Sequence, residues 1–104
     1  MTFREKAKTL EKLAELGVED RVLDQTLTKL IDYAVEKHRE DLKEINAKLH
    51  TLEKEFGMPS EQFYEKFHRG ELGDEESFFR WDALIEMYRR VDQRLSLLLS
   101  GHSV

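Results

Sequence analysis

The sequence contains no cysteine, a single proline and only five glycines among its 104 residues. Without cysteine, the chain cannot form disulfide scaffolds, zinc fingers, iron–sulfur sites or thiol nucleophiles. No apolar run approaches the roughly 20 residues that a membrane-spanning helix needs. The first residues also lack an apolar signal segment. We therefore expect a cytoplasmic protein that makes no membrane contact.

Strand patterns are missing as well, because the chain shows neither strict polar–apolar alternation nor Asn-Gly or Asp-Gly hairpin turns. Leu, Glu, Lys, Ala and Arg dominate instead, and these residues favour helices. The length suits one small domain, and 39% hydrophobic residues allow only a thin core. The sequence therefore predicts an all-α fold in one helical domain that spans residues 1–104.

Glycine separates two predicted helices in the first half of the chain. A short N-terminal helix is expected over residues 3–16, followed by Gly17 in the position favoured for a left-handed cap. A long helix is expected over about 19–56, a stretch that contains neither glycine nor proline. Gly57 and Pro59 then end it, because proline cannot continue a helix.

The second half predicts a short connecting helix and a long last one. Ser60 is a suitable N-cap for a helix over 61–68. Asp74 is the expected cap of the last helix, about 74–99, after which residues 100–103 should fray. The last helix can run antiparallel to the second half of the long helix and form a helical hairpin.

The long helix carries an apolar seam whose members recur every three or four residues, with one irregularity around His38. A straight helix over 19–56 would be about 57 Å long at 1.5 Å per residue. A compact domain of this size has a radius of gyration of roughly 13 Å. Either the helix bends near His38 or the hairpin is elongated, and we favour the elongated hairpin.

The last helix cannot cover the N-terminal part of this seam. A second copy of the chain could cover it better than the short helix 3–16, so we expect a homodimer with the long helices in contact. The alternative is a compact monomeric bundle in which the first helix folds back fully. The candidate dimer-seam residues are Leu23, Leu27, Leu30, Ala34 and His38.

Residues that could support catalysis are few. Ser60 and Ser77 are better explained as a helix cap and a first-turn residue, and His38 lies in the seam. The pair Glu65 and His68 has the Glu-x-x-His spacing of helical di-metal proteins but ends a short helix. We therefore predict no enzyme, no cofactor and no assigned metal ligand, and we retain a metal-binding helical protein as the weakest alternative.

The acidic balance disfavours direct DNA binding. The formal net charge is −5, and acidic residues open the last helix where a DNA-reading helix would present basic ones. Seven of the ten aromatic residues fall between positions 63 and 88, more than one narrow seam can hold. Aromatic anchors supply much of the binding energy of protein interfaces. The partner-binding candidates, divided between core and interface, are Phe63, Tyr64, Phe67, Leu72, Phe78, Phe79 and Trp81.

Three motifs in this region resemble a family of small prokaryotic helical proteins whose pattern reads YGMS…F…F, GELGD and FFEW. Here they read FGMPSEQFY at 56–64 with Phe67 after it, GELGD at 70–74 and SFFRW at 77–81. The likeness runs from about Asp24 onward, and residues 1–17 lie outside it. Phe56 stands in place of the usual Tyr, and Arg80 in place of the usual Glu, which could alter partner choice.

Members of this family resemble the antitoxins of toxin–antitoxin pairs, many of them encoded beside TumE-type toxins. The resemblance implies a protein that binds and neutralises a cognate toxin and has no enzymatic activity of its own. An acidic helical chain is suited to cover a basic site that acts on nucleic acid. The alternative is a structural coiled-coil adaptor that has no toxin partner.

Overall fold

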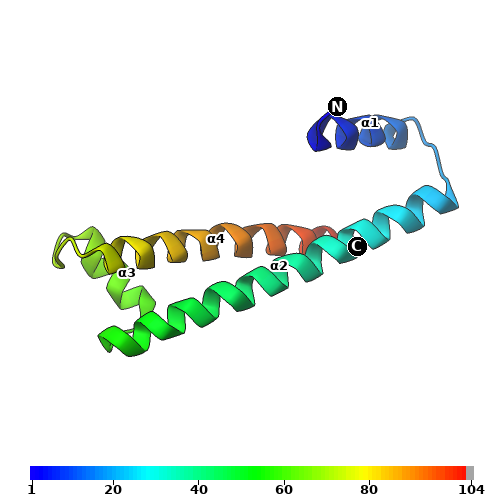
Figure 1. Cartoon of the computed structure of the whole chain (residues 1–104). Coiled ribbons are helices and arrows are strands. Elements are labelled where there is room, and N and C mark those ends of the chain that lie inside the picture. Colours follow the sequence, from blue (N-terminus) through cyan, green and yellow to red (C-terminus); the bar gives the residue numbers. More distant parts are fainter. Residues whose placement is uncertain (103–104) are drawn as a thin grey trace. The chain divides into compact units, whose positions relative to one another are not determined.

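The computed structural model describes residues 1–102 and contains four helices and no strand within that range (Figure 1). The helices are α1 (Phe3–Glu15), α2 (Arg21–Phe56), α3 (Ser60–His68) and α4 (Glu76–His102). The predicted all-α fold, with its long, connecting and last helices, is confirmed.

The ends of α1 and α2 follow from local chemistry. Gly17 adopts a left-handed conformation with φ of 79° after α1, as the sequence predicts, and Gly57 does so with φ of 66° after α2. α2 begins at Arg21, two residues later than expected. The reason is Asp20, whose carboxylate accepts hydrogen bonds from the backbone N–H groups of Val22 and Leu23 at 2.8 and 3.0 Å.

The caps predicted for α3 and α4 differ from those in the structure. Ser60 is the first residue of α3 and not its cap, because Pro59 already holds the extended backbone conformation of the N-cap position. α4 begins at Glu76, so Asp74 lies before the helix and does not cap it. The first turn instead forms at Glu75, whose carbonyl accepts the N–H of Phe78 at 3.0 Å.

The predicted end of α4 is also too early. The helix continues past Leu99 to His102, and the Ser100 hydroxyl donates a hydrogen bond to the Leu97 carbonyl at 3.1 Å within it. Residues 100–102 are therefore helical and not frayed. Ser103, the last residue of the predicted frayed end, lies outside the described residues.

Contacts divide the chain into two compact units. The first unit, Met1–Asp32, holds α1 and the beginning of α2. The second unit starts at Tyr33 and holds the rest of α2 together with α3 and α4. That residues 1–104 form a single domain stays a prediction.

The second unit contains the hydrophobic core. In this unit, α3 joins the end of α2 to α4, which runs back antiparallel to α2 (Figure 1). Phe63 of α3 and Trp81 of α4 are fully buried, and their rings stack at 4.0 Å with an interplanar angle of 4°. The remaining core members are Ile45 and Leu49 of α2 and Ile85 and Val91 of α4.

Candidate interaction surface

The first unit exposes apolar side chains on both of its helices. None of its residues is buried, and only Ile31 is half-buried. A hollow of about 630 Å³ lies between α1 and the start of α2 and has charged residues at its rim. We call its apolar lining the N-terminal apolar groove: Leu10, Leu13, Ala14, Val18, Leu23 and Leu27. The leucines and the valine of this groove are 36% to 45% exposed.

The dimer-seam candidates divide between the two units. Leu23, Leu27 and Leu30 belong to the first unit and are exposed. Ala34 and His38 belong to the second unit and are half-buried. His38 Nδ1 lies 2.6 Å from the carbonyl oxygen of Ala34, so the imidazole contacts its own helix. α2 is a single helix through this position.

The aromatic candidates lie together, but mostly in the core. Phe63 and Trp81 are fully buried and are unavailable to a partner in this structure. Tyr64, Phe67, Leu72 and Phe78 are half-buried and pack around them. Phe79 differs, because it is 55% exposed and contacts the Phe67 ring edge-on at 5.3 Å between centroids. Phe79 is therefore the most exposed aromatic ring among the seven candidates.

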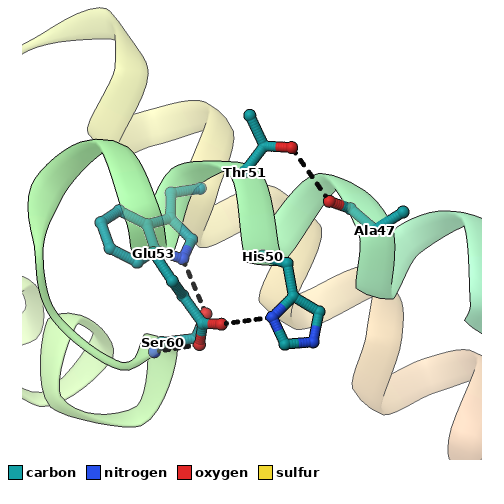
Figure 2. Close-up of polar contacts among 6 residues, drawn as sticks. Ala47, His50, Thr51, Glu53 and Ser60 are labelled. Carbon is teal, nitrogen blue, oxygen red and sulfur yellow. Dashed lines mark hydrogen bonds and ion pairs between the residues drawn. The ribbon is translucent and has the colours of Figure 1, made fainter.

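A polar contact that the sequence analysis missed joins α2 to the start of α3 (Figure 2). One carboxylate oxygen of Glu53 accepts the backbone N–H of Ser60 at 2.8 Å, and the other lies 3.3 Å from His50 Nδ1. Glu53 therefore satisfies an N–H group at the N-terminus of α3, although it belongs to another helix. No local motif marks this contact, because the two residues lie seven positions apart across a turn.

The same contact explains why a serine, a histidine and a glutamate meet here without forming a nucleophilic site. The Ser60 hydroxyl accepts a hydrogen bond from Trp81 Nε1 at 2.9 Å. His50 pairs with the Glu53 carboxylate, and no hydrogen bond joins His50 to Ser60. The Ser60 hydroxyl and the His50 imidazole thus contact different partners, and each supports the junction between the helices.

A second polar cluster lies where α3 meets α4. The Tyr64 hydroxyl donates to Glu86 Oε1 at 2.7 Å, and this hydrogen bond to a carboxylate raises the pKa of Tyr64, with burial as the next cause. The Arg89 guanidinium lies 4.0 Å from the centroid of the Tyr64 ring. His68 Nε2 lies 2.7 Å from Asp82 Oδ1, whereas Glu65 pairs with Arg69 at 3.9 Å. The two residues of the Glu-x-x-His spacing thus contact different partners in the structure.

Comparison of the chain with family models, curated proteins and solved structures finds no match. Among residues 1–102, none of the helices has both the length and the apolarity needed to cross a bilayer.

The Glu53 contact predicts a measurable loss of stability. Glu53→Ala leaves the Ser60 N–H without its acceptor, so the free energy of unfolding should fall by about 1 kcal/mol, the usual cost of losing a helix cap. Urea denaturation followed by circular dichroism measures it. Glu44→Ala is the matched control, since Glu44 is exposed on the same helix and makes only a 3.8 Å ion pair with Lys48. Equal effects of the two substitutions would contradict the capping role.

Proposed function

We propose that this chain is a non-enzymatic protein-binding module, and that it acts as the antitoxin of a toxin–antitoxin pair. The protein-binding part rests on the surface of the first unit. The antitoxin part rests on the motif resemblance and on the acidic charge of the chain.

The observation that carries the proposal is that the first unit, Met1–Asp32, has no buried side chain. A helix of 13 residues such as α1 is marginal in water unless its apolar face packs against something. The N-terminal apolar groove leaves much of that face exposed to water. Burying a leucine side chain fully contributes about 1.5–3 kcal/mol, so a partner that covers several of them gains substantial affinity.

A second copy of the chain is the partner we assign to this surface. Leu23, Leu27 and Leu30 follow one another at steps of four and three residues on α2, which is the spacing of a coiled-coil seam. The seam can pair with itself across a two-fold axis, as most homodimer interfaces do. We therefore propose a homodimer in which the two α2 helices contact each other near their N-termini.

We assign toxin binding to a different surface of the chain, around Phe79. This ring is the exposed member of the aromatic cluster and lies next to Arg80, the position at which the chain departs from the FFEW pattern. Aromatic and arginine side chains are the residue types that most often dominate binding energy at interfaces. The net charge of −5 favours a basic partner, as expected of a toxin that acts on nucleic acid.

The dimer is tested by one substitution in the seam. Leu27→Asp places a carboxylate in the proposed interface, and an unpaired buried charge is strongly unfavourable. Light scattering should give twice the chain mass of 12.4 kDa for the natural sequence and the single mass for the variant. Gln25→Asp adds the same charge at another exposed position of α2 and should leave the dimer intact. A monomeric natural sequence would exclude the dimer.

The toxin is tested by co-expression with the product of the neighbouring gene. We expect that product to arrest growth alone, and this chain to restore growth and to co-purify with it. Phe79→Ala should weaken the complex about tenfold or more, as loss of an interface anchor does. Leu97→Ala is the matched control, since Leu97 is an exposed apolar residue elsewhere on α4. A harmless neighbour, or a complex indifferent to Phe79, would contradict the assignment.

The coiled-coil adaptor remains the second candidate, and the exposed seam residues favour it as much as the antitoxin. The two functions share the homodimer and differ only in the toxin. A dimer that forms normally beside a harmless neighbouring protein would therefore favour the adaptor.

A further inference from the structure

Three metal-ligating side chains meet on the surface of the second unit, where α3 packs against α4. One ligand atom each from His68, Asp82 and Glu86 can be chosen so that all three lie within 4.8 Å of one another. We call these three residues the His68 cluster. It does not include Glu65, the partner that the sequence spacing suggests for His68, because Glu65 pairs with Arg69.

The packing of α3 against α4 brings the three side chains together. Asp82 and Glu86 lie one helical turn apart on α4, so they share a face of that helix. His68 is the last residue of α3, and its side chain extends from the C-terminal end of α3 to α4. The side chains of His68 and Asp82 are 48% and 24% exposed, so an ion from solvent can reach them.

A hydrogen bond holds the third ligand. The Tyr64 hydroxyl donates to Glu86 Oε1 at 2.7 Å, which orients the Glu86 carboxylate next to the His68–Asp82 pair. Hydrogen bonds of this kind from neighbouring residues orient the ligands of known metal sites.

One imidazole nitrogen and two carboxylates form a donor set that suits Zn²⁺, which binds three protein ligands and leaves one position open to water. At bond lengths near 2.0–2.2 Å, two donors on a tetrahedral ion lie about 3.4 Å apart. The donors of the His68 cluster are within reach of this geometry through side-chain rotation. The 2.7 Å separation between His68 Nε2 and Asp82 Oδ1 must widen to admit the ion.

Arg89 opposes the binding of a cation to the His68 cluster. Its guanidinium lies 3.9 Å from Glu86 Oε1 and covers the ring of Tyr64. Its positive charge lowers the affinity of the neighbouring carboxylate for a metal ion. Removing that charge should therefore strengthen binding, an effect opposite in sign to removal of a ligand.

We propose that His68, Asp82 and Glu86 bind one Zn²⁺ ion, which joins the end of α3 to α4. The ion replaces the hydrogen bond between His68 and Asp82 with three coordinate bonds that link the two helices. The proposal is independent of the homodimer and of the toxin, because it uses neither the N-terminal apolar groove nor Phe79.

The test is a calorimetric titration of the untagged, metal-stripped full chain with ZnCl₂. We expect one Zn²⁺ per chain and a rise in melting temperature with added Zn²⁺, since a ligand that binds the folded state stabilises it. His68→Gln should weaken binding about tenfold or more, and Arg89→Gln should strengthen it. His50→Gln is the matched control. His50 is also exposed and also contacts a carboxylate, that of Glu53 at 3.3 Å, but within residues 1–102 it belongs to no cluster of three such ligands.

The proposal is overturned if the natural chain shows no saturable Zn²⁺ binding, or if His68→Gln and His50→Gln weaken it equally. The second result would mean that the ion binds scattered surface histidines. Circular dichroism of each variant checks that its helices are retained. If His68→Gln does not fold, Co²⁺ added to the natural chain decides the question: the visible absorption of tetrahedral Co²⁺ supports the site, and its absence excludes it.

Discussion

The stacked pair of Phe63 and Trp81 is the contact on which the rest of the second unit depends. The two fully buried rings join α3 to α4, and the Trp81 indole also stacks with Phe56 near the end of α2. Its N–H is satisfied by the Ser60 hydroxyl, so burial of this polar group carries no penalty. Through this one contact the hydrophobic core and the polar cap at the start of α3 support each other.

The first unit lacks any comparable contact, and this difference between the units underlies the proposed function. The second unit buries its largest aromatic rings, whereas Met1–Asp32 buries no side chain. Exposed apolar residues are common singly, whereas a groove lined by several of them supports the proposal that this surface binds another chain. The proposal assigns self-association to the first unit, and places toxin binding around Phe79 on the second unit.

The sequence predicted the four helices because glycine, proline and apolar spacing act locally. Gly17 and Gly57 end α1 and α2 where expected, since each adopts a left-handed conformation. Ser60 is not the cap of α3 because Pro59 takes that position, and its hydrogen bonds with Glu53 and Trp81 depend on packing between helices, which local sequence does not reveal. The His68 cluster was missed for the same reason: His68 and Glu86 are 18 positions apart, and spacing within one helix cannot reveal them.

Amide hydrogen exchange, measured at two protein concentrations, tests most directly the claim that the first unit is covered by a second copy. Exchange reports local opening, and an interface between two copies forms more completely as the concentration rises. The account predicts that amides of α1 and of Arg21–Asp32 exchange more slowly at the higher concentration, while those around Trp81 do not change. Exchange in Met1–Asp32 that is equally fast at both concentrations would contradict it.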